Sequence, residues 1–99
     1  MKPTQLEKTD DGCLLVSGEL SMDTVPELLK QGHLQSGSDG DIRVDLQGVE
    51  RADSAGVALL VEWQRAANRQ QHTIHFQNIP SQMLAIARLS GVDVLLALN

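Results

Sequence analysis

The residues best placed for chemistry are Asp53 and Ser54, which lie between a predicted strand and a predicted helix. Both residue types favour the N-cap of a helix, so the Ser54 hydroxyl is expected near the free backbone N–H groups of the helix start. A serine in this position is compatible with four roles. It can be a catalytic nucleophile, part of an anion site, a phosphorylation site or a simple helix cap.

A catalytic nucleophile needs a general base within hydrogen-bond reach and a group that orients that base. The sequence around Ser54 is not a nucleophile elbow, because that motif has glycine two residues before the serine and this chain has Ala52. The three histidines are His33, His72 and His75, and no predicted element directs any of them to the turn. We therefore expect no catalytic residues and no enzymatic activity.

Cofactor and metal motifs are also missing from the sequence. It contains neither the glycine-rich loop of nucleotide hydrolases nor the one of dinucleotide-binding proteins. His72 and His75 are separated by an odd number of residues, so on a strand they would face opposite sides. We expect no bound cofactor and no metal site.

The net charge and the cysteine content indicate the classes of partner and the cellular compartment. The net charge of −5 offers no basic stripe for nucleic acid or for anionic lipid. Cys13 is the only cysteine, which rules out an intramolecular disulfide and favours a reducing compartment. The N-terminus lacks an apolar signal segment, and no run approaches the ~20 apolar residues of a membrane span. We expect a cytoplasmic protein that reaches a membrane only through a partner.

Hydrophobic periodicity predicts two strands, then helix, strand, helix, strand and helix, and an apolar tail. The strands are expected at residues 5–9, 13–20, 41–46 and 73–77, and the helices from Thr24 to about residue 35 and at 55–68 and 82–89. The tail at 92–98 is expected as a short last strand or as a strand with a helical turn. Helices that connect successive strands imply parallel pairing, whereas the Asp-Gly turn at residues 11–12 implies an antiparallel first pair. Alternation in the later strands indicates helices mainly on one face. The prediction is a single α/β domain over residues 1–99 with a small mixed sheet.

On a helical wheel at about 100° per residue, the helix that follows Ser54 has a core face and an outer face. The core face holds Gly56, Leu59, Leu60, Trp63, Ala66 and Ala67, and the outer face holds Val57, Ala58, Val61, Gln64, Arg65 and Asn68. Ser54 projects to the outer face. Scattered surface valines are common, but an aliphatic pair beside a special hydroxyl predicts a docking surface for another protein.

Two stretches, residues 45–49 and 52–60, resemble the signature of STAS domains, a family that includes the anti-sigma-factor antagonists. Residues 16–20 and 24–28 resemble the end of the second strand and the first helix of that family. The resemblance covers nearly the whole chain. It implies the STAS fold, and it places the family's phosphorylatable hydroxyl at Ser54 and the acidic residue before it at Asp53.

Within that family the short chain looks most like the MlaB-type subunits of bacterial phospholipid-transport ABC complexes. This resemblance implies a non-enzymatic subunit that binds the ATPase subunit at the inner membrane and supports assembly or activity. The expected contact residues are Asp53, Ser54, Val57, Ala58, Val61 and Arg65. The alternative is an anti-sigma-factor antagonist in a partner-switching pathway, with Ser54 phosphorylated by a serine kinase that is also its partner. The added charge of about −1.5 to −2 beside Asp53 would oppose docking.

Overall fold

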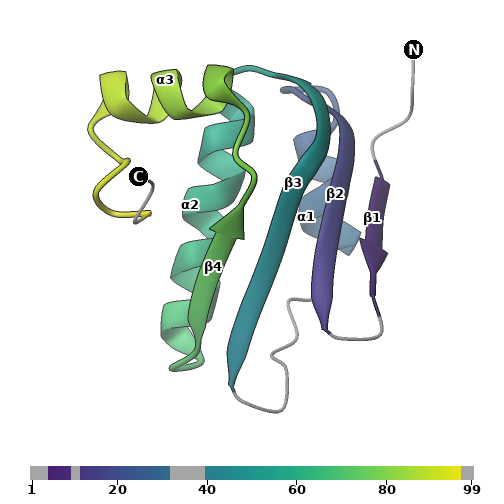
Figure 1. Cartoon of the computed structure of the whole chain (residues 1–99), viewed down its shortest axis with the longest axis vertical. Helices are drawn as coiled ribbons and strands as arrows, with labels where there is room; N and C mark the ends of the chain where they lie inside the picture. The colour runs from purple at the N-terminus through teal and green to yellow at the C-terminus, as the bar shows by residue number, and fades with distance from the viewer. Residues whose placement is uncertain (1–4, 10–11, 32–39, 97–99) are drawn as a thin grey trace.

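Four strands form one mixed sheet in the order β1-β2-β3-β4 (Figure 1). Their bounds are β1 Gln5–Lys8, β2 Cys13–Leu20, β3 Asp41–Ala52 and β4 Thr73–Gln77. β1 pairs antiparallel with β2, whereas β3 is parallel to both of its neighbours. The structure, a computed structural model, describes residues 5–9, 12–31 and 40–96. The predicted strand directions are confirmed.

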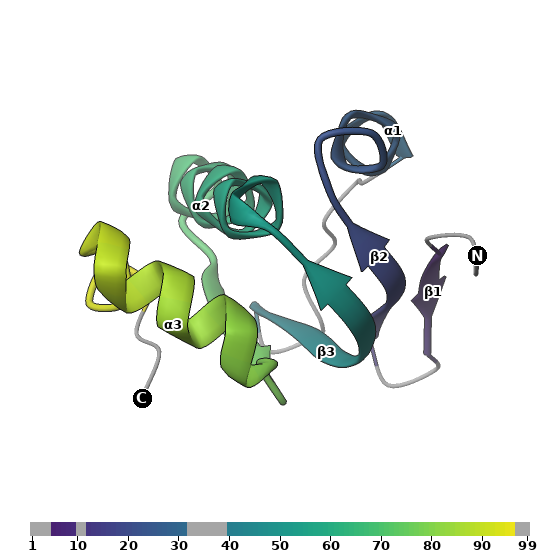
Figure 2. The same cartoon turned by 90° about the horizontal axis from the view of Figure 1, so that it is seen from above.

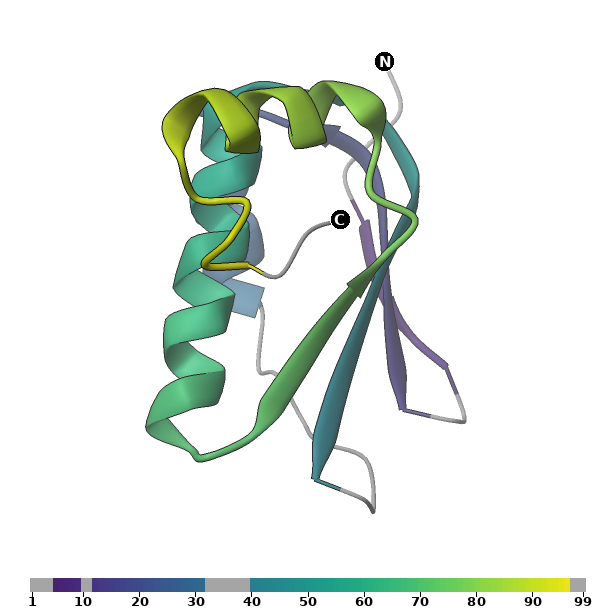
Figure 3. The same ribbon diagram turned by 60° about the vertical axis from the view of Figure 1, so that its left-hand side comes forward.

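Two helices, α1 (Val25–Gln31) and α2 (Ser54–Arg69), cover the same face of the sheet (Figure 2). The third helix, α3 (Ser81–Ser90), lies across one end of the fold, between α2 and the sheet (Figure 3). The predicted α/β class, with helices mainly on one face, is therefore confirmed. The predicted end of the first helix near residue 35 lies outside the described residues.

Alternation along β3 explains why one face of the sheet is covered. In its first half the buried side chains are Ile42, Val44 and Leu46, each at most 1% exposed. The residues between them face the other side, where a small charged group gathers. The Asp41 carboxylate there lies 3.8 Å from the Arg43 guanidinium and 3.4 Å from Nε2 of His75. The period of two thus separates an aliphatic core from a polar face.

β3 is longer than predicted, because it continues past Leu46 to Ala52. Residues 47–52 are expected from the sequence as a turn. Instead, Gly48 and Val49 pair with the second half of β2 after one register shift, and Arg51 and Ala52 after a second. Glycine is typical of a turn, but Gly48 lies within β3, where β2 is too close for a side chain to fit. A Cβ atom on it would lie 2.8 Å from the Ser17 Cβ and 3.1 Å from the Val16 carbonyl oxygen. The extension brings the end of β3 beside the end of β2.

The expected strand in the apolar tail is absent from residues 92–96, which form a helical turn instead, and residues 97–99 lie outside the described part. Gly91 has φ of 76°, its N–H donates to the Arg88 carbonyl at 3.1 Å, and the Val92 N–H donates to the Ala87 carbonyl at 2.9 Å. This pair of bonds is a Schellman motif, which reverses the chain after a helix. Leu96 then donates to the Val92 carbonyl at 3.0 Å and is 2% exposed. The tail therefore folds back into the core.

The close approach at Gly48 generates a stability prediction. Gly48→Ala should lower the free energy of unfolding by about 1–3 kcal/mol, because the new methyl group overlaps Ser17 and strains the β2–β3 pairing. Urea unfolding followed by fluorescence of Trp63, the sole tryptophan in the sequence, measures the change. Gln47→Ala, at an exposed neighbouring position, is the control and should stay within about 0.5 kcal/mol of wild type. Equal stability of both variants would contradict the packing argument.

Candidate functional site

The turn between β3 and α2 is fixed by Asp53, which is the N-cap of the helix. Its carboxylate accepts a hydrogen bond of 2.8 Å from the Ala55 N–H, and its backbone is extended. Its own N–H donates to the Leu20 carbonyl of β2 at 3.0 Å, and its carbonyl accepts from the Gly56 N–H at 3.0 Å. Asp53 thus joins the helix start to the sheet.

Because Asp53 performs the capping, Ser54 is the first residue of α2 rather than its cap. Ser54 is exposed, and within the described part of the chain its hydroxyl makes no recorded hydrogen bond. The free N–H groups and the dipole of the helix start favour an anion at this position. The serine hydroxyl is therefore available to a partner or to a modifying enzyme.

Neither described histidine lies close to this hydroxyl. The 16 residues of α2 extend about 24 Å, and His72 follows the far end of the helix. His75 lies on the polar face of the sheet beside Asp41. His33 lies outside the described residues. Within residues 5–9, 12–31 and 40–96, no three His, Cys, Asp or Glu side chains gather as a metal-binding group.

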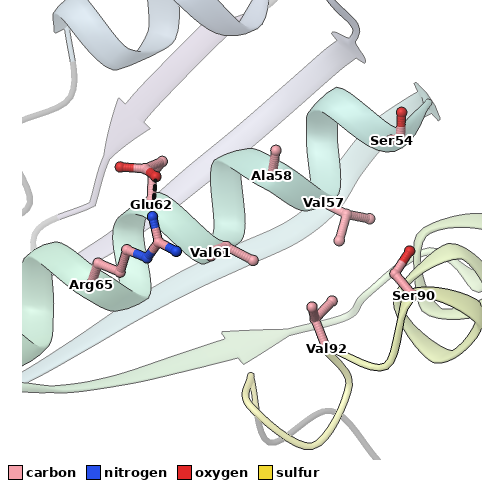
Figure 4. Close-up of a pocket in the computed structure, with 8 residues that line it drawn as sticks. All are labelled: Ser54, Val57, Ala58, Val61, Glu62, Arg65, Ser90 and Val92. Atoms are coloured by element: carbon pink, nitrogen blue, oxygen red, sulfur yellow. Dashed lines mark hydrogen bonds and ion pairs between the residues drawn. The ribbon is translucent and has the colours of Figure 1, made fainter.

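Val57 is a correction to the expected surface, because it is buried at 5% exposure and belongs to the core cluster. Val61 is half-buried and packs against the same cluster. The helical wheel failed here because α2 has a second neighbour besides the sheet. Figure 4 shows Val57 and Val61 pointing toward Ser90 and Val92 at the end of α3. Much of the predicted aliphatic pair therefore stabilises the monomer.

The outer side of α2 still presents a continuous row of exposed residues. We define the α2 strip as Ser54, Ala58, Glu62 and Arg65, all exposed and spaced four, four and three residues apart. This spacing places them on one side of the helix. The Glu62 carboxylate lies 3.0 Å from the Arg65 guanidinium, a solvent-exposed pair of little energetic weight.

A shallow groove of about 360 Å³ runs beside the α2 strip, toward α3 (Figure 4). Val57 and Val61 form its floor on α2, and Ser90 and Val92 border it on the other side. Asp53, Ser54, Ala58 and Arg65 are exposed as expected, so most of the predicted contact residues lie on one accessible surface around α2.

Sequence analysis missed three residues of this surface, namely Glu62, Ser90 and Val92. Glu62 has the helical spacing of the other strip residues and was identifiable from that spacing alone. The other two required a tertiary contact. A Ser-Gly-Val sequence at a helix end does carry a signal, because the residue after the glycine of a Schellman motif often makes an apolar contact. That signal predicts the turn but not the helix that Val92 meets.

Comparisons with known proteins agree with this architecture. The protein family described as "Mlab, STAS domain" matches residues 4–97. The anti-sigma factor antagonist SpoIIAA in its unphosphorylated form has a TM-score of 0.58 at 19% identity, with coverage of 87% of this chain and 82% of that one. An anti-sigma factor antagonist from Mycobacterium paratuberculosis gives 0.54 at 20% identity, with coverage of 93% and 80%. At these identities the two structures show the fold. No curated protein matches the chain.

The division of roles at the turn can be tested by substitution. Asp53→Ala should lower the free energy of unfolding by about 1 kcal/mol, because the Ala55 N–H loses its acceptor. Ser54→Ala should remain within about 0.5 kcal/mol of wild type, because no capping bond is removed. Asp53→Asn keeps a capping oxygen and serves as the conservative control. Urea denaturation measures all three, and a larger loss for Ser54→Ala than for Asp53→Ala would refute the assignment.

Proposed function

Because the chain belongs to the MlaB-type STAS family, we propose that it is a non-enzymatic subunit that docks on the ATPase subunit of a bacterial phospholipid-transport ABC transporter. The α2 strip and Asp53 form the contact, and binding supports assembly or activity of the transporter and thereby lipid asymmetry. The observation that carries the proposal is the exposed Ser54 hydroxyl, released from capping at the start of a solvent-facing strip.

The composition of the α2 strip suits a reversible protein contact. Ala58 is small, so a partner can approach the helix backbone closely, and Ser54 offers both a donor and an acceptor. Glu62 and Arg65 form a polar rim at the other end. A non-obligate interface as a whole is only about as apolar as the rest of a protein surface, so a polar strip beside a half-buried apolar groove is compatible with one. The strip therefore supports docking without leaving a large apolar patch in the free protein.

The proposal also concerns location. No helix in the described residues has the length and apolar character required to cross a bilayer. In this proposal the transporter holds the protein at the inner membrane, and the protein itself remains on the cytoplasmic side.

Ala58→Glu tests the proposed contact. The variant places a larger, charged side chain in the centre of the α2 strip and should lower recovery of the ATPase subunit at least tenfold, which corresponds to about 1.4 kcal/mol. Ala85→Glu introduces the same change at an exposed position of α3 and should bind like wild type. Co-purification from the host with quantitative mass spectrometry measures recovery. If wild type recovers neither the ATPase nor the permease of such a transporter, the proposed function is wrong.

A second candidate function is that of an anti-sigma-factor antagonist controlled by phosphorylation of Ser54. It is favoured by the accessible hydroxyl at a helix start and by the fold shared with two antagonists. The helix dipole would tolerate a phosphate there, while the Asp53 carboxylate and a partner surface selected for a neutral hydroxyl would disfavour it. Phosphorylation would then release the partner without a large change of fold.

Ser54→Asp tests the second function. For a partner-switching antagonist, the added carboxylate should lower affinity for the kinase at least tenfold, because it places two negative charges in succession at the interface. Ser54→Ala, which cannot be phosphorylated, should keep binding and lose any phosphate detected by intact-mass spectrometry after incubation with the kinase and ATP. Unchanged kinase affinity of Ser54→Asp would exclude a charge switch at this position.

A further inference from the structure

The connection between β2 and α1 presents an unusual side chain. Met22 is 78% exposed, and among the large apolar residues of the described chain only Leu89 and Val94 are more exposed. A single exposed apolar residue is common on protein surfaces and needs no explanation by itself. Three further features make the exposure of Met22 significant. They are the hydrogen bonds that hold its loop, the position of that loop and the charges around it.

The loop that carries Met22 is held by hydrogen bonds on both sides. The Thr24 hydroxyl donates to the Glu19 carbonyl at 2.7 Å and accepts from the Ser21 N–H at 2.9 Å. The Ser21 hydroxyl oxygen accepts from the Asp23 N–H at 3.2 Å. Because none of these bonds uses the Met22 side chain, the loop is fixed while the methionine stays in solvent. A preorganised loop reduces the entropy lost when a partner binds.

The same loop lies beside the start of α2. The Asp53 N–H donates to the Leu20 carbonyl, one residue before the loop begins. Ser21 and Asp53 line one small hollow between the two connections. Figure 1 shows both connections at the same end of the sheet, where α1 and α2 begin. The loop that carries Met22 therefore lies at the same end of the fold as the turn that contains Asp53 and Ser54.

The charges at this end are mainly acidic. Asp23 and Asp53 are both exposed, and within the described residues the Asp23 carboxylate has no recorded hydrogen bond or ion pair. Arg51 is an exposed cation that lines the hollow with Asp53. The whole chain carries −5. A partner that covers this end therefore meets an exposed apolar side chain and a mainly acidic surface.

We infer that Met22 is a second anchor of the docking surface, inserted into an apolar socket of the partner that is rimmed by lysine or arginine side chains. This inference rests on the proposed function and extends the contact from α2 to the β2–α1 loop. Methionine is suited to the role, because its flexible thioether adapts to an irregular socket. The basic rim would pair with Asp23 and Asp53 and orient the complex.

The test measures dissociation constants of the purified full chain with the purified ATPase subunit. Met22→Ser should weaken binding about tenfold, because a buried methionine contributes free energy of that order. Met22→Leu should stay within about threefold of wild type. Asp23→Asn should make the dissociation constant less dependent on salt concentration, because one charge of the contact is removed. Val94→Ser, at an apolar residue 84% exposed in the C-terminal turn, is the matched control and should bind like wild type.

The outcomes separate the inference from the proposed function. If wild type binds the ATPase and Met22→Ser binds equally well, the Met22 anchor is wrong and the proposed function stands. If Val94→Ser weakens binding and Met22→Ser does not, the partner covers the C-terminal turn instead. If wild type does not bind the ATPase, the proposed function fails, and the same series with the serine kinase decides the inference. Binding to neither protein overturns both.

Discussion

The position of the proposed docking surface depends on how closely the first turn of α2 packs against the ends of β2 and β3. A Cβ atom on Gly56 would lie 3.0 Å from the Leu20 Cβ and 3.3 Å from the Ala52 Cβ, so glycine allows the helix backbone to rest almost directly on the strand ends. The Asp53–Leu20 hydrogen bond fixes the same junction. This contact locks Ser54 relative to the sheet and to the β2–α1 loop, so the surface is built before any partner arrives.

Much of this arrangement follows from local sequence. The alternation of β2 and β4 reproduces their observed bounds, because a strand that covers one core face must repeat every two residues. The residue types of Asp53 and Ser54 identify the start of α2, although only the structure shows which of them is the cap. Gly56, Leu59, Leu60, Trp63 and Ala67 are buried as the helical wheel predicts, and Ala66 is half-buried.

The errors share one physical cause, since each depends on a contact between distant segments. Gly48 has the composition of a turn, yet it continues β3 because β2 offers a partner across a register shift. Val57 has a surface position on the wheel, yet it belongs to the core cluster because α3 and the turn after it face this side of α2. A helical wheel describes a single helix and contains no information on which other elements pack against it. Long-range packing decides such positions, and local periodicity does not contain it.

Helix capping and the exposed hydroxyl belong to two different residues, Asp53 and Ser54, so either one can be substituted without loss of the other. The Asp53 carboxylate makes the capping hydrogen bond, so the residue at position 54 does not need to cap the helix. Exchange of serine for threonine, or for a side chain without a hydroxyl, leaves the helix start intact. A surface hydroxyl at this position can therefore be gained or lost by a single substitution while the architecture stays the same.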